Sequence, residues 1–246
     1  MIRFEVQGQV AVITIARPER RNALTPDMLT RLTKAAQSVE RTPARAIVLA
    51  GDGPAFCSGF DLSLCKIAPD GSVMRSLLTG LSQVIVALRS QPLPIVVAAH
   101  GAALAGGCAL LGAADFVVTN DDAKLGYPVL KLGVSPAVSV PFLRLLAGDG
   151  VARERTLDTR VVSGPEGVRV GIAHESLADA AAVLPRALAL AGELAAKPPG
   201  AMMATRRWLD VVAGDTAGSA AAALTASLSL TGGDEERAML PAAWTR

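Results

Sequence analysis

The chain has 246 residues, 51% hydrophobic and 19% charged, which is enough for one large domain with a substantial core and too apolar for a disordered chain. The formal net charge of +2 includes no basic block, and aromatic residues make up only 3%, so we expect no nucleic-acid partner. The three cysteines have no metal-ligand or disulfide spacing, no apolar run could span a bilayer, and no signal peptide opens the chain. We therefore expect a cytoplasmic protein with no metal site and no membrane partner.

The first half of the chain alternates between strand and helix patterns. Residues 4–6 and 10–15 predict a hairpin around Gly8, and Thr25-Pro26 predicts the start of a helix that continues to about Arg41. Apolar runs at 46–50, 94–99 and 116–119 predict buried strands, whereas 73–88 and 108–114 predict helices. This order is typical of an α/β fold with parallel strands.

The last third of the chain predicts helices. Short helices are expected at 138–146 and 151–157, and longer ones at 178–196, 200–212 and 217–230. No convincing strand pattern follows Pro165. We expect an α/β core over residues 1–195 and an α-helical C-terminal region over residues 196–246.

Two turns rich in small residues each follow a predicted strand. Residues 56–62 read Phe-Cys-Ser-Gly-Phe-Asp-Leu, and residues 101–108 read Gly-Ala-Ala-Leu-Ala-Gly-Gly-Cys. Such turns let backbone N–H groups face a ligand, and a helix N-terminus adds positive potential. Two turns that converge on one oxygen stabilise negative charge on it. The alternative interpretation is tight packing of a helix against the sheet.

Four motifs in order give the chain a resemblance to the crotonase superfamily, also called the enoyl-CoA hydratase/isomerase family. They are Arg17-Pro18 with Asn22-Ala23-Leu24, the turn at 56–62, the turn at 101–108, and Leu125-Gly126-Tyr127-Pro128 with Leu132-Gly133. The resemblance covers nearly the whole chain. It implies a spiral of ββα units, a helical C-terminal region that builds trimers, often paired into hexamers, and an acyl-CoA ligand with no cofactor besides the CoA of the substrate.

The resemblance also implies roles for individual residues. By motif position, the backbone N–H groups of Phe60 and Gly106 hold the thioester carbonyl as it becomes an enolate. CoA is expected along the loop of Arg20, Arg21 and Ala23 and along the turn of Ser58, Gly59, Asp61 and Leu62. The two arginines are candidates for pairing with phosphate, or are solvated loop side chains. Leu104, Pro128, Val129 and Leu132 are candidate contacts of the substrate.

The chain departs from the family at the two glutamates with which hydratases position and activate water. By motif position these glutamates fall at Ala109 and Val129, whose side chains exchange no proton. Because each general acid–base step contributes roughly 10²–10⁴ in rate, ordinary hydration is not expected, and the isomerase interpretation is weakened as well. A pair of backbone donors still stabilises an enolate formed in another way, for instance by loss of carbon dioxide.

Other side chains near these motifs offer few substitutes. Tyr127 is the candidate acid, with packing in a strand as its alternative role, and Asp61 is a weaker candidate because this acid is usually structural in the family. We expect capping roles for Ser135 and Ser139. We expect the three cysteines to be small buried residues: Cys57, Cys65 and Cys108.

Three hypotheses about function follow from the sequence. The first is an enzyme of the lyase or isomerase class that uses the Phe60–Gly106 oxyanion hole for chemistry other than hydration. The second is a non-catalytic acyl-CoA-binding or regulatory protein. The third is a weak hydratase or isomerase that uses Tyr127. The sequence leaves open the acyl group and the choice between trimer and hexamer.

Overall fold

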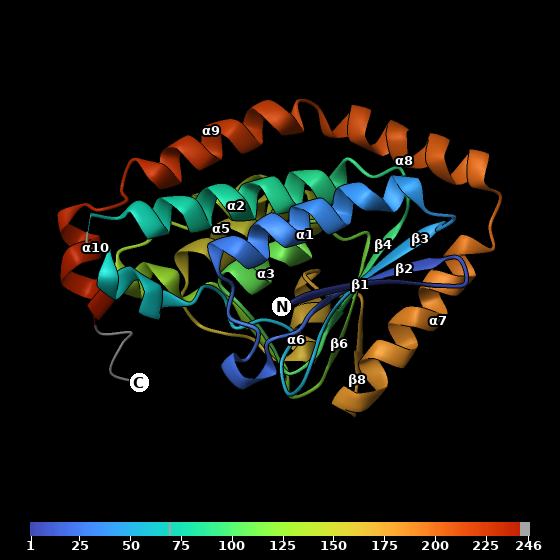
Figure 1. The fold of residues 1–246 in the computed structure, drawn as a ribbon, viewed down its shortest axis with the longest axis horizontal. Coiled ribbons are helices and arrows are strands. Elements are labelled where there is room, and N and C mark those ends of the chain that lie inside the picture. Colours follow the sequence, from blue (N-terminus) through green and yellow to red (C-terminus); the bar gives the residue numbers. More distant parts are fainter. Residues whose placement is uncertain (69, 242–246) are drawn as a thin grey trace.

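A sheet with helices on both faces lies at the centre of the molecule (Figure 1). The computed structural model describes residues 1–68 and 70–241. The hairpin of β1 (Ile2–Gln7) and β2 (Val10–Ile15) is antiparallel, and parallel strands follow β2 across the sheet. In order, these strands are β3 (Ala46–Gly51), β4 (Ile95–Ala99), β6 (Phe116–Asn120) and β8 (Glu175–Leu177). The predicted hairpin and the α/β class with parallel strands are confirmed.

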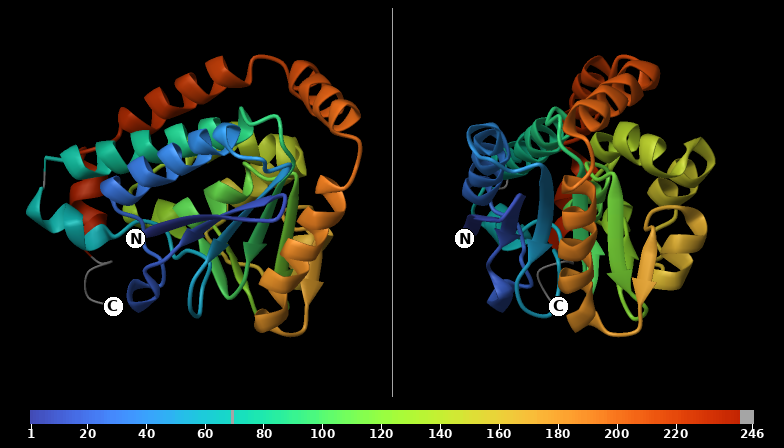
Figure 2. Two further views of the ribbon diagram at one scale, coloured as in Figure 1. Left: turned by 45° about the vertical axis from the view of Figure 1, so that its right-hand side comes forward. Right: turned by 90° about the vertical axis from the view of Figure 1, so that its right-hand side faces the viewer.

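Both faces of the central strands are buried, which explains why these strands read as continuous apolar runs. Ile47 and Leu49 of β3 face a core that includes α1 (Pro26–Ser38) and α2 (Ser72–Arg89). Val48 faces a second core beneath α7 (Val183–Ala195), whose small residues allow helix and sheet to approach closely. Figure 2 shows α7 against one side of the sheet and α1 and α2 on the other.

A second, shorter layer of backbone pairing runs beside the main sheet. β5 (Ala102–Leu104) pairs in parallel with β7 (Lys124–Gly126). Isolated bridges extend this layer from Leu24 to Phe60, from Cys57 to Ala103 and from Leu125 to Val162. Both predicted glycine-rich turns therefore belong to one layer, which places them side by side although they are far apart in the sequence.

Shorter helices and the C-terminal helices complete the fold. Two of the C-terminal helices, α8 and α9, form an arch over α2 in Figure 1. The bounds of the remaining α-helices are α3 (Gly106–Leu111), α4 (Val140–Ala147), α5 (Asp149–Leu157), α6 (Gly164–Val170), α8 (Pro199–Ala213), α9 (Thr216–Leu228) and α10 (Asp234–Met239). The 3-10 turns are η1 (Pro18–Arg20), η2 (Val39–Arg41), η3 (Leu62–Ile67), η4 (Pro128–Leu132), η5 (Ala137–Ser139) and η6 (Ala180–Ala182). In the described part of the chain, no helix is long and apolar enough to cross a bilayer.

The structure corrects two predicted elements. β8 lies beyond Pro165, where no strand was expected; it is a short, partly exposed edge strand of Glu, Ser and Leu, so it carries no apolar run. The helix expected at 108–114 is α3, which begins at Gly106 and ends at Leu111. The division at residue 195 stays a prediction: α7 ends there and α8 begins at Pro199, while residues 242–246 lie outside the described part.

Candidate functional site

The turn that carries Phe60 is fixed by a bridge to Leu24. The Leu24 N–H donates to the carbonyl of Gly59 at 2.8 Å, and the Asp61 N–H donates to the carbonyl of Leu24 at 2.9 Å. In a parallel bridge the residue between these two partners turns its own N–H to the opposite side. The N–H of Phe60 therefore points away from Leu24 and is not consumed by the pairing.

The second turn places Gly106 at the first position of α3. Ala105 precedes it with φ 51° and ψ −116°, a conformation that costs a non-glycine residue on the order of 1–3 kcal/mol. The Ala105 N–H donates to the carbonyl of Gly126 at 2.9 Å, which holds this conformation in place. Because the first N–H groups of a helix have no acceptor within the helix, hydrogen bonding within α3 does not use the Gly106 N–H.

The two turns touch each other. A Cβ built on Gly59 would lie 3.0 Å from the Cβ of Ala105 and 3.6 Å from the amide nitrogen of Gly106. Gly59 has a φ of 100°, so the absence of a side chain there serves both the backbone conformation and the close approach. A Cβ on Gly106 would lie 3.0 Å from the Phe60 ring. The predicted donors thus come from two backbone turns in direct contact.

Phe60 and Gly106 line one end of an apolar cavity of about 140 Å³. Its walls come from the two turns, α2, η4 and the segment 134–139. Among the described residues that line it, none is Asp, Glu, His, Lys or Arg. The lining residues are Ser58, Phe60, Leu62, Met74, Leu78, Leu81, Leu104, Ala105, Gly106, Tyr127, Pro128, Val129, Leu132, Val134, Ser135, Pro136, Val138 and Ser139. Val129 therefore presents a hydrocarbon side chain to the cavity, and Ala109 is buried within α3.

Tyr127 is the titratable side chain in this lining. It lies just after β7, not within the strand, and its side chain is 2% exposed. Its hydroxyl hydrogen-bonds with Cys108 and with Ser139. Burial, reinforced by Cys108, holds the pKa of Tyr127 well above its ordinary value, so the phenol is neutral at physiological pH.

The two serines near this cavity differ in role. Ser135 Oγ accepts a hydrogen bond from the Ala137 N–H at 3.3 Å, as a capping residue does. Ser139 precedes α4, but its side chain makes no capping bond and contacts Tyr127 instead. The capping expectation for Ser139 is therefore wrong, because its side chain is directed to the buried hydroxyl of Tyr127.

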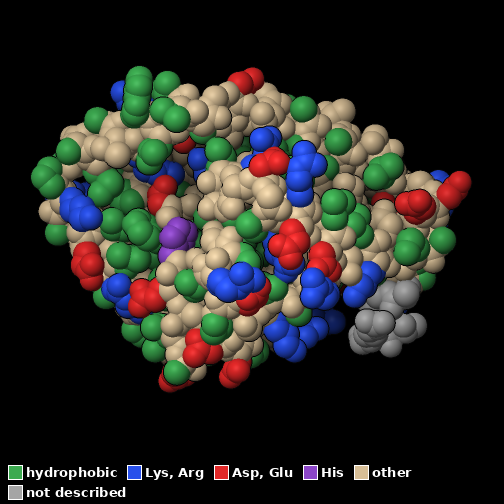
Figure 3. Space-filling view, turned by 180° about the vertical axis from the view of Figure 1, so that it is seen from behind, with side chains coloured by type: hydrophobic (Ala, Val, Ile, Leu, Met, Phe, Trp, Pro, Cys, Tyr) green, Lys and Arg blue, Asp and Glu red, His purple; other side chains and the backbone are tan. Residues whose placement is uncertain are grey.

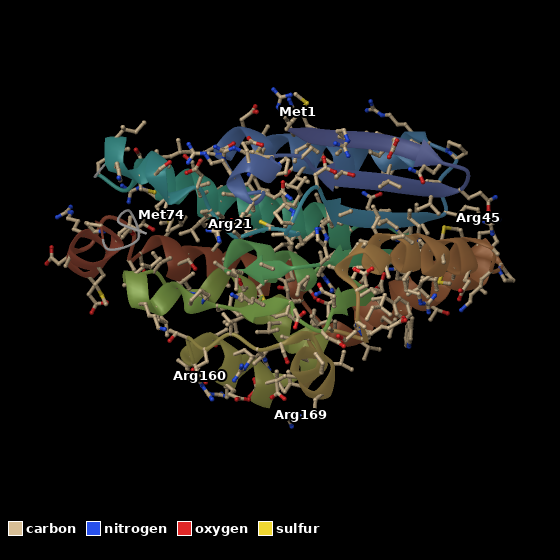
Figure 4. All side chains as sticks on the ribbon, turned by 90° about the horizontal axis from the view of Figure 1, so that it is seen from below. Met1, Arg21, Arg45, Met74, Arg160 and Arg169 are labelled. Carbon is tan, nitrogen blue, oxygen red and sulfur yellow. The ribbon has the colours of Figure 1, made fainter. Side chains whose placement is uncertain are left out.

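A polar groove adjoins the apolar cavity and shares Ser58, Phe60, Leu62 and Leu104 with it. Its volume is about 430 Å³. The other lining residues are Glu19, Arg20, Arg21, Ala23, Asp61, Ser63, Ala102 and Lys124. Lys124 was not predicted, because only the pairing of β7 with β5 brings the start of β7 to the groove. In Figure 4, Arg21 of the groove and Met74 of the cavity lie toward the same end of the molecule, and Arg45 lies near the opposite end.

Two side chains of the first motif, Arg17 and Asn22, fix the loop before Leu24 through contacts that the sequence did not predict. Asn22 is fully buried: its Oδ1 accepts from the Arg17 N–H at 2.8 Å, and its Nδ2 donates to the carbonyls of Asp52 and Ala55 at 2.8 and 2.7 Å. Arg17 pairs with Asp61 and also donates to the carbonyl of Ala23 at 2.9 Å. Asp61 thus has a structural role at the edge of the groove.

The cysteines are small buried residues, as expected. Burial raises the pKa of Cys57 and of Cys108 to about 12, and that of Cys65 to about 11. A thiol is a nucleophile only as the thiolate, so these residues are inert at neutral pH. In the described residues, the structure therefore offers no cysteine chemistry beside the two turns.

The fold and the cavity together define a class of protein, an α/β spiral in which two backbone turns meet at the end of an apolar cavity. The family model described as enoyl-CoA hydratase/isomerase matches residues 5–230. A putative enoyl-CoA hydratase from Thermus thermophilus is 35% identical over 215 residues, which is 85% of this chain and 83% of the relative. A probable enoyl-CoA hydratase from Bacillus subtilis is 32% identical over 200 residues, 80% and 77% of the two chains.

Solved structures agree with these relatives. An enoyl-CoA hydratase/isomerase from Xanthobacter autotrophicus Py2 superposes with a TM-score of 0.88 at 28% identity, over 99% of this chain and 93% of the other. The chain belongs to the enoyl-CoA hydratase/isomerase family, a lyase and isomerase family that acts on acyl-CoA thioesters. The predicted family and the crotonase-like fold are confirmed.

Proposed function

We propose that this protein binds an acyl-CoA thioester and stabilises its enolate between the backbone N–H groups of Phe60 and Gly106. The observation that carries the proposal is the direct contact of the two turns at the end of a cavity without charged residues in its described lining. Backbone N–H donors aimed at one oxygen in an apolar site strongly stabilise the negative charge that develops on it. One such donor contributes about 10²–10³ in rate.

The groove and the cavity divide the ligand between them. The acyl chain occupies the apolar cavity, and the CoA portion runs along the groove, where Arg20, Arg21 and Lys124 are suited to phosphate oxygens. CoA enters as part of the substrate, and no further cofactor is needed. Ser58 and Leu104, which line both spaces, lie where the thioester joins the two parts.

The chemistry differs from ordinary hydration of a double bond. Hydration requires a base for water and an acid for the α-carbon, and the described lining of the cavity provides no carboxylate for either. An enolate formed by loss of carbon dioxide needs no protein base. This reaction class is therefore the leading candidate for catalysis at the two donors.

The same absence favours a second candidate, a non-catalytic acyl-CoA-binding or regulatory protein. A third version is weak hydratase or isomerase activity with Tyr127 as the acid. Its support is a neutral hydroxyl within the cavity, hydrogen-bonded to Cys108 in the first turn of α3. The raised pKa makes Tyr127 a weak acid, which favours the first two candidates over this one.

We also propose that the protein assembles into trimers or hexamers through its C-terminal helices. α8 exposes large apolar side chains, among them Trp208, Leu209 and Val212, which are 60% exposed or more. Seen from behind, hydrophobic side chains gather at the upper left of the molecule, on the side where α8 lies (Figure 3). Contiguous exposed apolar surface of this kind is typical of an interface.

Calorimetric titration with acetoacetyl-CoA tests the proposed function, because the enolate of this compound carries the negative charge that the two donors stabilise. In Gly106→Pro the N–H is removed at a helix position that accepts proline, and Gly106→Ala is the matched control that keeps the N–H while adding a Cβ near the Phe60 ring. We expect tight binding to the wild type, binding weakened about 100-fold in the proline variant, and an intermediate loss in the alanine variant. Equal binding to all three proteins would contradict the oxyanion role.

Turnover separates the enzyme from the binding protein. Wild-type protein is incubated with enoyl-, malonyl- and saturated acyl-CoA thioesters, and the products are separated by chromatography. Exchange of the α-hydrogens in deuterium oxide, followed by nuclear magnetic resonance, reports enolate formation even without net reaction. Saturable binding with neither product nor exchange would establish the non-catalytic alternative.

A further inference from the structure

Helix α9 reaches the wall of the acyl cavity through one buried side chain, Ser227, which is 2% exposed. Its Oγ accepts a hydrogen bond from the Val138 N–H at 2.9 Å and donates to the carbonyl of Ser135 at 3.4 Å. Val138 and Ser135 both line the cavity. One hydroxyl from the C-terminal region therefore holds the backbone of a cavity wall at two points.

We infer that Ser227 is a positioning residue for the acyl group, because its hydroxyl fixes the segment 134–139 and thereby sets the shape of the cavity. The inference rests on the proposed function for its ligand, an acyl-CoA thioester. The position of the wall, however, is a property of the chain itself and is measurable without any ligand.

A series of contacts leads from Ser227, through the chain at Val138 and Ser139, to the helix that begins at Gly106. Ser139 follows Val138 and hydrogen-bonds with Tyr127, whose hydroxyl also contacts Cys108. Cys108 lies in the first turn of α3, two residues after Gly106. A displacement of the wall at Val138 thus reaches Tyr127 directly, and the turn of the proposed donor through one further contact.

The C-terminal region contacts two other walls of the cavity. Gly133, at the end of η4, has a φ of 67°, and a Cβ there would lie 2.6 Å from the carbonyl carbon of Glu235 in α10. Arg75 of α2 donates to the carbonyl of Thr231 at 3.0 Å, in the turn before α10. η4 carries Val129 and Leu132, and α2 carries Met74, so the chain from Ser227 to Glu235 supports three sides of the acyl cavity.

Shape decides selectivity in such a cavity, because no side chain in the described lining carries a charge. One methylene in an apolar pocket changes discrimination by about 10- to 200-fold. A wall that is released by a fraction of an ångström therefore alters the preference among acyl chains more than it alters binding of CoA. Loss of Ser227 should broaden the range of accepted chains.

The ligand-free test uses the fact that Tyr127 is the only tyrosine of the chain. Near-ultraviolet absorbance of tyrosinate during an alkaline titration reports this one side chain, and far-ultraviolet circular dichroism on the same samples marks unfolding. In Ser227→Ala, water gains access to Tyr127, so ionisation should begin at lower pH while the helices are still folded. Ser229→Ala is the matched control, since that hydroxyl donates only to the carbonyl of Ala226 in its own helix turn, at 2.8 Å.

The binding test titrates wild type, Ser227→Ala, Ser227→Thr and Ser229→Ala with butanoyl-CoA, octanoyl-CoA and free CoA. We expect Ser227→Ala to change the ratio of the two acyl affinities by about 3- to 10-fold, the effect of one neutral hydrogen bond, with free CoA unaffected. Ser227→Thr keeps the hydroxyl and should show the wild-type ratio of butanoyl-CoA to octanoyl-CoA affinity.

The two tests distinguish failure of the inference from failure of the proposed function. Wild type that binds no acyl-CoA contradicts the proposed function, and the tyrosine titration then decides the inference alone. An unchanged tyrosine titration in Ser227→Ala overturns the inference, as does an unchanged acyl ratio where acyl-CoA binds. A shift shared by Ser229→Ala would show general loosening of α9 and would also overturn it.

Discussion

Arg17 and Asp61 form an ion pair, 2.8 Å between Nη2 and Oδ2, that joins the loop before Leu24 to the turn that carries Phe60. Burial alone would raise the pKa of Asp61, but hydrogen bonds from Ser63 and Arg17 outweigh it and leave the pKa below its usual value. The pair lies beside the Leu24–Phe60 bridge. Its strength therefore bears on the orientation of the proposed Phe60 donor.

Asp61→Asn should lower the free energy of unfolding by about 1–2 kcal/mol near neutral pH, because a charge-assisted hydrogen bond is lost. A lowered pKa in the folded state means that the contribution is complete above the unfolded pKa of about 3.9 and disappears as the pH falls through the folded value. Urea unfolding at several pH values measures both effects. Asp27→Asn, which breaks the exposed pair with Arg31, is the control and should change little. If the stability difference between wild type and Asp61→Asn increased as the pH fell, this explanation would be contradicted.

Val129→Glu should increase hydration activity, because the described lining of the wild-type cavity has no carboxylate. The new carboxylate would face the acyl cavity from η4, where Val129 already lies. We expect crotonyl-CoA hydration to rise at least about 10-fold, since one of two acid–base groups is restored. Val129→Gln, of nearly the same size but without a base, should show no gain. Wild type that already hydrates crotonyl-CoA as fast as Val129→Glu would contradict the hypothesis.

Arg206 anchors α8 to the core, with its Nε 3.0 Å from Asp115 Oδ2 and its Nη1 donating to the carbonyls of Gln91 and Leu93. Arg206→Ala should lower the free energy of unfolding by about 3 kcal/mol, because Asp115 is left in a largely buried place without its partner. Chemical denaturation measures the loss. The neighbouring exposed Arg207→Ala should be nearly neutral, and Arg206→Met with Asp115→Asn should recover part of the loss. If Arg206→Ala were as stable as the wild type, α8 would be held in place by other contacts.

His174 makes the stability depend on pH in the range where imidazole titrates. Its Nδ1 accepts a hydrogen bond from the Val117 N–H at 3.0 Å, which requires an unprotonated Nδ1. Burial lowers the pKa of His174, and Asp115 opposes this only in part. The unfolded chain then binds more protons, so stability is complete above about pH 6.5 and falls as the pH drops through the folded value.

Denaturation at about pH 7.5 and 5.5 checks this prediction, with His174→Asn as the variant that keeps an acceptor but does not titrate. The difference between the two proteins should change across this range. A parallel pH dependence in both would assign the effect to other groups.

Trp208→Glu should reduce the mass of the assembly observed by analytical ultracentrifugation, because a charge would enter the proposed interface on α8. Leu157→Glu, at an apolar side chain on α5 that is 73% exposed, is the control and should leave the mass unchanged. Wild-type protein that sediments as a monomer would refute the proposed assembly.

The elements that were predictable from the sequence are those whose own residues carry the pattern. β3 and β4 are continuous apolar runs because both faces of the sheet are buried, and α2 shows apolar residues at helical spacing. β8 has no such pattern, since its polar residues form an edge strand that only β6 stabilises. β5 and β7 are three residues each, and their pairing links segments that are distant in sequence.

The site shows the same limit. The two turns were predictable because each has a local composition of small residues, and the resemblance to the family then pointed to Phe60 and Gly106 within them. Lys124 and Ser227 carry no local signal, since each acts on a groove or a backbone segment that another part of the chain provides. Asn22 belongs to a motif, but its hydrogen bond to Ala55 was not predictable because Ala55 is distant in the sequence. The strain at Ala105 was equally invisible, because alanine has no preference for positive φ.

The two cores on opposite faces of the sheet contribute to the cavity unequally. Residues such as Met74, Leu78 and Val138 belong both to the core around α1 and α2 and to the cavity, whereas the core beneath α7 shares no described residue with the cavity or the groove. We therefore expect substitutions beneath α7 to change folding stability without changing ligand preference. Substitutions that change ligand preference should lie on the opposite face of the sheet. In evolutionary terms, the sheet separates the part of the sequence that tolerates drift from the part through which a new specificity arises.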